Sequence, residues 1–251
     1  MPNGETKVTA TFTIPEAAYG NNFVQFLRGW RPDTPYGFSF SVVPNLTVSP
    51  SPSSPHSSVT VKGTGFPAKN KDIKVLLDGN DTAMSIYTSD VGTFSGQLTI
   101  PETMAGSHTL KAYDENLSFG DITANLQIAP KISIEPQHPE IGSEVTLTGW
   151  GFASRSTVSV KYDDVAVSNS PITTDNGNFT ETFTVPESSS ETHIITATDR
   201  AGNVATSGMA AENKPPEAPN PISPVNQRFG WFGAQPVIFT WGEVSDPSGI
   251  S

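Results

Sequence analysis

The stretch that decides the fold is Gly149-Trp150-Gly151-Phe152, which occurs one repeat earlier as Gly63-Thr64-Gly65-Phe66. Each copy follows a short alternating run, Val145-Thr146-Leu147-Thr148 in one and Val59-Thr60-Val61 in the other. Landmarks on either side follow in the same order, about 85 residues apart, so the chain contains a tandem array. In each copy the glycines are expected to allow a bulge or a positive backbone angle, while the phenylalanine folds back over the end of the core.

Alternation of apolar and polar residues, bounded by turn residues, predicts the strands of the first complete repeat. We expect them near residues 46–49, 57–64, 72–78, 84–88, 93–100, 107–114 and 120–129. Asp90-Val91-Gly92 and Asp175-Asn176-Gly177 are expected to be turns that join strands. Seven short strands at this spacing favour two packed antiparallel sheets, so the sequence predicts an all-β fold of tandem sandwiches.

The repeat divides the chain into four predicted segments. Residues 46–130 and 131–213 are each expected to form a complete sandwich of about seven strands. Residues 1–45 match the second half of a repeat, with Pro15 lying nearly one period before Pro101. Residues 214–251 begin as a Pro-rich, extended linker and continue with two strand-like runs. We therefore expect partial domains at both ends of the array.

Composition limits the class of function. The chain has 22 prolines and 21 glycines among 251 residues, and 16% of its residues are charged, as is typical of an all-β chain with many turns. It has no cysteine, which leaves no disulfide framework and no thiol chemistry. No apolar run approaches the ~18 residues of a membrane span. The first residues lack the basic start and apolar middle of a signal peptide, so the chain is expected to carry no address of its own.

The net charge of -11 is concentrated in one repeat. Residues 131–213 contain 4 Lys and Arg against 11 Asp and Glu. An acidic surface repels phosphate backbones, so nucleic acid is not expected as a partner. These carboxylates are interpreted first as solvated charges that keep the protein soluble.

Candidate metal ligands are few. Asp163, Asp164, Asp175 and Asn178 could together offer oxygens to calcium, which needs six to eight of them. They lack the dense alternating spacing of a calcium-binding loop, so they form only a weak set, and the sequence predicts neither a metal nor a cofactor.

The distribution of histidines argues against an enzyme. His108 and His193 occupy the same place in successive repeats, which suits a strand position more than a catalytic base. His56 and His138 lie in Pro-rich loops without a spaced partner. No hydrolase, metalloprotease or phosphate-loop motif is present. We predict a non-catalytic protein.

Aromatic residues that could stack on a sugar ring are also few. Trp231 and Phe232, inside Phe229-Gly230-Trp231-Phe232-Gly233, are weak candidates for ligand binding, with core residues of an incomplete domain as the alternative interpretation. In the complete repeats, Trp150 and Tyr162 are the main candidates for a sugar platform.

The Gly-x-Gly-Phe runs make the repeats resemble immunoglobulin-like, TIG-like domains of prokaryotic surface and secreted proteins. The stretch Ala197-Thr198-Asp199-Arg200-Ala201-Gly202-Asn203 also looks like the ending of bacterial Ig-like repeats. Residues 219–251 are similar to the start of fibronectin type III-like domains, through Phe239-Thr240-Trp241 and the run Val244-Ser245-Asp246-Pro247-Ser248-Gly249. The resemblance implies Ig-like antiparallel sandwiches, and it is specific for architecture rather than activity.

Two functions remain open. The first is a structural or adhesive fragment of a long extracellular or cell-surface protein, in which the Ig-like repeats act as a stalk or spacer. The second is a carbohydrate-binding accessory module of a secreted glycoside hydrolase or another extracellular enzyme. The expected partners are neighbouring domains of the same polypeptide, together with a surface protein or a polysaccharide.

Overall fold

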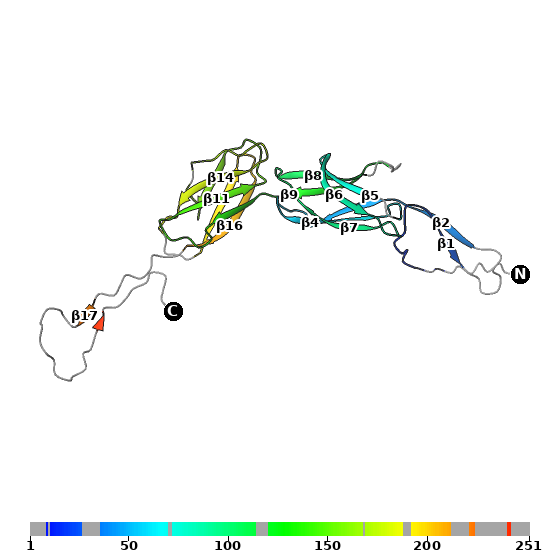
Figure 1. Ribbon diagram of the computed structural model, residues 1–251, viewed down its shortest axis with the longest axis horizontal. Helices are drawn as coiled ribbons and strands as arrows, with labels where there is room; N and C mark the ends of the chain where they lie inside the picture. The colour runs from blue at the N-terminus through cyan, green and yellow to red at the C-terminus, as the bar shows by residue number, and fades with distance from the viewer. Residues whose placement is uncertain are drawn as a thin grey trace, which may run out of the picture. The chain divides into compact units, whose positions relative to one another are not determined.

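The computed structural model describes residues 9, 11–26, 36–69, 72–113, 120–167, 169–187, 192–211, 221–223 and 240–241 (Figure 1). Every regular element in these ranges is a β-strand, which confirms the predicted all-β class. No helix in them is long and apolar enough to cross a membrane. The contacts divide the chain into two units, one of residues 1–101 and 106–128, the other of residues 102–105 and 129–251.

The first unit contains a seven-stranded antiparallel sandwich. One sheet has the strand order β3 (Asn45–Ser49), β4 (Ser58–Thr64), β7 (Phe94–Thr99). The other has the order β6 (Asn80–Tyr87), β5 (Asp72–Leu77), β8 (Gly106–Tyr113), β9 (Ile122–Ile128). The core lies between the two sheets.

The second unit repeats this topology strand for strand. One sheet has the order β10 (Lys131–Glu135), β11 (Glu144–Trp150), β14 (Phe179–Thr184). The other has the order β13 (Val165–Ala166), β12 (Val158–Tyr162), β15 (Thr192–Asp199), β16 (Val204–Ala210). Both are Ig-like antiparallel β-sandwiches, as the sequence predicts.

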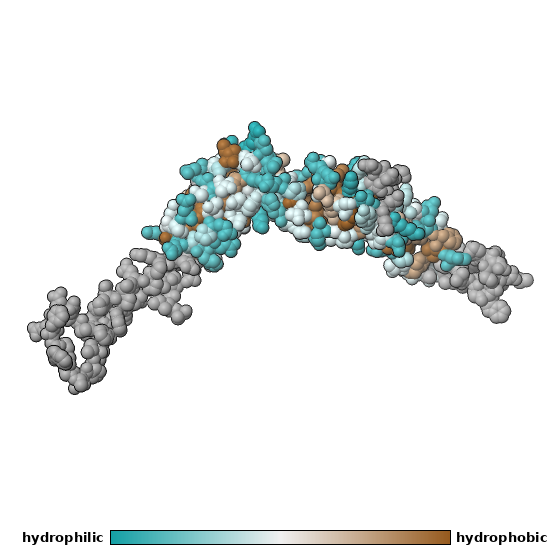
Figure 2. All heavy atoms as spheres, in the orientation of Figure 1, coloured by the Kyte–Doolittle hydropathy of each residue, from teal (hydrophilic) through white to brown (hydrophobic). Residues whose placement is uncertain are grey.

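Period-two alternation places one face of each strand in the core. In β4 the side chains of Val59 and Val61 are buried, and in β11 those of Val145 and Leu147 are buried. Their neighbours along each strand are polar and more exposed, because successive side chains point to opposite faces of a sheet. On the face shown in Figure 2, hydrophilic and neutral residues accordingly predominate over the two sandwiches.

The two glycines of each Gly-x-Gly-Phe run have different tasks. A Cβ on Gly63 would lie 2.1 Å from the ring of Phe94, and one on Gly149 would lie 2.1 Å from the ring of Phe179, so the first glycine makes room for an aromatic ring on the neighbouring strand. The second glycine has a positive φ, 69° at Gly65. This backbone angle favours glycine and lets the chain turn into the core.

The phenylalanine of the run closes the core. Phe66 and Phe152 are both fully buried. Phe66 meets Phe94 edge to face at a centroid distance of 5.0 Å, and Phe152 meets Phe179 at 5.3 Å. The two phenylalanines thus have matching neighbours in the two sandwiches.

Two short antiparallel pairs lie outside the sandwiches. In the first unit β1 (Gly20–Phe26) pairs with β2 (Tyr36–Val42), and in the second β17 (Pro221–Ser223) pairs with β18 (Thr240–Trp241). These pairs fall within the terminal segments predicted as partial domains, most of whose remaining residues lie outside the described ranges. The boundaries at residues 45, 130 and 213 stay predictions.

One strand of the first sandwich starts four residues earlier than the sequence indicates. β6 begins at Asn80, whereas alternation predicts a start near residue 84. Asn80-Asp81-Thr82-Ala83 has few strand-forming residues, and the register shifts here between Val75 and Leu76. The Thr82 hydroxyl donates to the Val75 carbonyl at 2.6 Å, so a side-chain bond holds the irregular part of the strand pair together.

Candidate functional site

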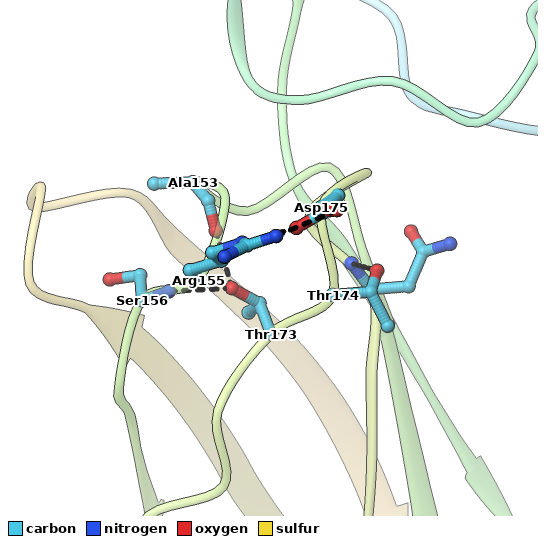
Figure 3. A network of polar contacts seen from close by, with 7 residues as sticks. Ala153, Arg155, Ser156, Thr173, Thr174 and Asp175 are labelled. Carbon is cyan, nitrogen blue, oxygen red and sulfur yellow. Dashed lines mark hydrogen bonds and ion pairs between the residues drawn. The ribbon is translucent and has the colours of Figure 1, made fainter.

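The loops at one end of the second sandwich carry a network of polar contacts (Figure 3). The Arg155 guanidinium donates to both carboxylate oxygens of Asp175, from Nε at 2.5 Å and from Nη2 at 3.1 Å. This pairing raises the pKa of Arg155 and lowers the pKa of Asp175. Both side chains are largely exposed, so the pair joins two loops at the surface without closing a cavity.

Beneath this pair, Thr173 connects the same two loops through buried hydrogen bonds. Its hydroxyl donates to the Ala153 carbonyl at 2.5 Å and accepts the Ser156 N–H at 2.8 Å (Figure 3). The side chain is 3% exposed. Because this buried hydroxyl both donates and accepts a hydrogen bond, it holds the two loops together.

Asp199 performs the same task for the turn between β15 and β16. Its carboxylate accepts the Ala153 N–H at 2.7 Å, the Asn203 N–H at 2.9 Å and the Asn203 Nδ2 at 2.8 Å. Burial works to raise the pKa of Asp199, but these donors outweigh it and the pKa is lowered. At this end of the sandwich, the polar side chains therefore hold the loops in place through hydrogen bonds to carboxylate and hydroxyl oxygens.

An Asp–His pair, formed by an exposed aspartate and a buried histidine, lies at the turn between β12 and β13. Ionised Asp163 can only accept, so His193 Nδ1 is the donor in their 2.5 Å hydrogen bond. The second carboxylate oxygen accepts the Ile194 N–H at 2.8 Å. His193 is fully buried and stacks on Tyr162 at a centroid distance of 4.5 Å. The pair therefore joins a tight turn to the strand beside it.

The first sandwich has the same pair. His108 Nδ1 donates to Asp78 at 2.6 Å, and the Thr109 N–H donates to the other oxygen at 2.8 Å. Asp78 and Asp163 both have a positive φ, 49° and 44°, in the first position of a two-residue turn. The recurrence shows that the pair belongs to the architecture of the repeat.

We expect Asp163→Asn to lower the urea midpoint of the second sandwich at pH 7 and to flatten its decline toward acid. The hydrogen bonds from His193 and then Ile194 hold the pKa of Asp163 below its ordinary value. Their stabilisation is complete above the unfolded-state pKa of about 3.9 and is lost as the pH falls through the lower folded-state pKa. Urea midpoints measured from about pH 6 to about pH 2 span this range.

Asp164→Asn is the matched control for this experiment. Asp164 is the next residue of the same turn, exposed and also at a positive φ. Its replacement should leave the pH dependence close to that of the parent. Parallel curves for Asp163→Asn and the parent would contradict a stabilising role of the pair.

The calcium candidates lie in two separate places. Asp163 and Asp164 follow the last residue of β12, whereas Asp175 pairs with Arg155, which precedes the first residue of β12. The five residues of this strand span about 16 Å. The structure thus brings Asp175 near Asn178 but not near the Asp163-Asp164 turn.

Of the remaining two candidate ligands, Asp175 has both carboxylate oxygens bound to Arg155. The Asn178 side-chain oxygen is buried without a hydrogen-bond partner. Among the described residues, no group of three or more His, Cys, Asp or Glu side chains is placed to hold a metal ion.

The aromatic candidates for sugar binding differ in how far they are buried. Tyr162 is 4% exposed, so its ring belongs to the core and offers no platform, contrary to the expectation from its sequence position. Burial raises the pKa of Tyr162 to about 12, with a further contribution from Asp163. Trp150, the last residue of the central strand β11 of the other sheet, is half-buried. Trp231 and Phe232 lie outside the described residues.

No protein-family model matches this sequence, and neither does any curated protein sequence. Several solved structures have a similar arrangement of strands. One is the Yersinia pseudotuberculosis adhesin InvE, at 15% identity and a TM-score of 0.31, over 67% of this chain and 58% of that one. Another is a C-terminal fragment of intimin in complex with the intimin-binding domain of the translocated intimin receptor, Tir. It matches at 15% identity and a TM-score of 0.31, over 68% of this chain and 64% of that one.

A third is a Bacteroides ovatus glucan-utilisation protein, SGBP-B, in complex with a mixed-linkage heptasaccharide, at 14% identity and a TM-score of 0.31, over 81% of this chain and 57% of that one. The match thus spans less than two thirds of each of these three chains. At this level of similarity the comparison concerns the fold and not the partner.

The Asp–His pair is the feature that sequence reasoning missed, although a signal was present. In both repeats the aspartate lies 30 residues before the histidine. A recurring Asp at the first position of a predicted two-residue turn, combined with a His at a fixed distance, would have indicated a contact between the turn and the strand.

Proposed function

We propose that the two sandwiches are non-catalytic, load-bearing spacer domains of a surface or secreted multidomain protein. The observation that carries the proposal is that the first and last parts of each sandwich are hydrogen-bonded to each other. In the first sandwich the Ser53 N–H donates to the Gln127 carbonyl at 2.9 Å, and the Gln127 N–H donates to the Ser51 hydroxyl at 3.0 Å. In the second, the Ala210 N–H donates to the Gln137 carbonyl at 3.3 Å.

The direction of this pairing matters under tension. Ser53 forms a parallel bridge with Ile128, at the end of β9. When the two ends of a sandwich are pulled apart, parallel segments at its beginning and end slide along each other, so several hydrogen bonds are loaded together. A spacer between a cell and a head domain carries such a load.

The chemistry of the loops supports a structural role as well. Thr173, Asp199 and the Asp–His pairs use their polar atoms to fix loops and turns. Side chains committed in this way are not poised to act on a substrate. The proposed partners are neighbouring domains of the same polypeptide, and a protein or a polysaccharide at the surface where the whole protein is displayed.

We expect the double variant Ser51→Ala/Ser53→Pro to lower the force at which the first sandwich unfolds in single-molecule pulling of the full chain. Alanine removes the hydroxyl acceptor at position 51, and proline removes the N–H donor at position 53. Each opened sandwich of about 85 residues should release roughly 250–300 Å of chain, which makes the events countable.

Two controls accompany this measurement. The unfolding force of the second sandwich, in the same molecules, should not change. Thr47→Ala removes a hydroxyl bond of 3.2 Å to the Lys62 carbonyl within the antiparallel β3–β4 pair, and it should have less effect than the double variant. An unaltered force for the double variant would count against load bearing. Capture of the chain by immobilised polysaccharides would favour the accessory-module alternative.

A further inference from the structure

The β1–β2 hairpin has the same register as the last two strands of the first sandwich. Gly20 pairs with Val42, Asn22 with Phe40 and Val24 with Phe38. In β8 and β9, Gly106 pairs with Ile128, His108 with Leu126 and Leu110 with Ala124. Each hairpin residue lies one repeat length, roughly 86 residues, before its counterpart, so no insertion or deletion separates the two hairpins.

The first residues of the two hairpins also share a backbone conformation. Gly20 has a φ of 113° and Gly106 a φ of 131°. In both cases an added Cβ would meet nothing within 4 Å, so the positive φ, and not crowding, accounts for the glycine. Register and backbone therefore agree that β1–β2 has the architecture of the closing hairpin of a sandwich.

The residues before the hairpin extend this correspondence and differ in burial. Phe12 corresponds to Leu98, and Ile14 corresponds to Ile100. Leu98 and Ile100 are 3% and 0% exposed in the first sandwich, whereas Phe12 and Ile14 are 46% and 45% exposed. The same positions that form a core in the complete repeat are thus half open here.

One face of the hairpin is mostly apolar. It carries Val24, Phe38, Phe40 and Val42 together with Gly20 and Asn22, and the ring of Phe12 lies 6.3 Å from that of Phe38. The opposite face is mostly polar, with Asn21, Gln25, Ser39 and Ser41, and carries Phe23 as its large apolar residue. Apolar residues accordingly reach the surface around β1 and β2 in Figure 2.

We propose that the apolar face of β1–β2 docks on a three-stranded apolar sheet of the β3-β4-β7 kind, and that the two together form a third sandwich. The occupant is the first half of an Ig-like repeat, placed in the polypeptide before this hairpin. Both complete sandwiches support this choice, since in each of them a three-stranded sheet covers the closing hairpin. The segment 16–44 also has the same length as the segment 102–130 that closes the first sandwich.

Hydrogen exchange of the full chain tests the proposal. In a chimera, residues 45–101 are placed directly before Glu16 and residues 16–251 are kept. We expect the amides of residues 20–26 and 36–42 to exchange at least about tenfold more slowly in the chimera than in the parent chain. The amides of β15 and β16 should exchange equally in both.

Variants on the two faces of the hairpin serve as a matched pair. Phe38→Asp, on the apolar face, should abolish the added protection in the chimera, whereas Phe23→Asp, on the other face and 57% exposed, should leave it. Equal effects of the two would overturn the assignment of the docking face.

A second chimera tests whether mismatched core volumes alone prevent docking in the first. It carries Asn22→His, Phe38→Ala and Phe40→Leu, which are the residues of β8 and β9 at the same register positions. Slower exchange of the hairpin amides in the first chimera, in this second chimera or in both supports the proposal. If the hairpin amides exchange as fast in both chimeras as in the parent chain, the proposal is overturned. A dimer of the parent chain with slow-exchanging hairpin amides would identify a second copy as the occupant and would also overturn it.

Discussion

Replacing Gly177 with alanine should destabilise the second sandwich by about 2–5 kcal/mol. A non-glycine residue at positive φ costs roughly 1–2 kcal/mol, and forcing an atom into a packed site adds roughly 1–3 kcal/mol. Gly177 has a φ of 77°, and its Cβ would lie 1.9 Å from the Phe152 carbonyl oxygen. The loop would have to move away, although the Gly177 carbonyl accepts the Phe152 N–H at 3.0 Å.

Gly202→Ala separates the two causes. Gly202 has a φ of 87° in the turn between β15 and β16, but an added Cβ there meets nothing within 4 Å. Its replacement should cost only the backbone part, about 1–2 kcal/mol. Urea unfolding followed by hydrogen exchange on each sandwich measures both variants, and the first sandwich is the internal reference. If both variants lose the same free energy of unfolding, the loop can move the added Cβ away from the Phe152 carbonyl oxygen without a loss of stability.

Phe152→Ala should cost roughly 3–5 kcal/mol, the usual range for removing a buried aromatic side chain. Phe152 is fully buried, and its ring packs edge to face on Phe179. A loss of this size is a large part of the stability margin of a small domain, typically about 5–15 kcal/mol. The urea midpoint of the second sandwich is again the measurement.

Val165→Ala is the control for Phe152→Ala, because it also shortens an apolar side chain of the same sandwich. Val165 is 67% exposed, so its change should stay within about 0.5 kcal/mol. A midpoint that falls as far for Val165→Ala as for Phe152→Ala would mean that the stability of this sandwich does not depend on the closed end of its core.

Local rules were enough to predict the strands and the turns. Alternation marks a strand because one face of each sheet is buried, and Gly92 and Gly177 mark turns because their φ angles of 71° and 77° favour glycine. The start of β6 was not predictable in this way. It is held by a side-chain bond from Thr82 to a neighbouring strand, and such a bond exists only after the strands have paired.

The roles of the residues in the candidate site were even less predictable from local sequence. Asp163 and Asp175 are both acidic residues next to turns, and nothing in their immediate sequence separates them. Their roles differ because one faces His193, about 30 residues further along, and the other faces Arg155, about 20 residues before it. Contacts of this range depend on the topology of the sandwich, which composition and spacing do not supply.

The closing hairpins of the two complete sandwiches also share a register, since His108 lies opposite Leu126 and His193 lies opposite Met209. If the sandwiches carry load as proposed, this register has a consequence for recovery after stretching. When neighbouring sandwiches have been pulled open and the tension falls, each first half meets two closing hairpins that form the same backbone ladder, so exchange of hairpins competes with correct refolding. The side chains oppose this exchange, because β9 ends with Leu126 and Ile128 where the second sandwich has Met209 and Ala211. An exchanged pair would lack most of a buried isoleucine side chain, at a cost of about 2–5 kcal/mol. Divergence between adjacent repeats thus allows each unit to recognise its own last strands.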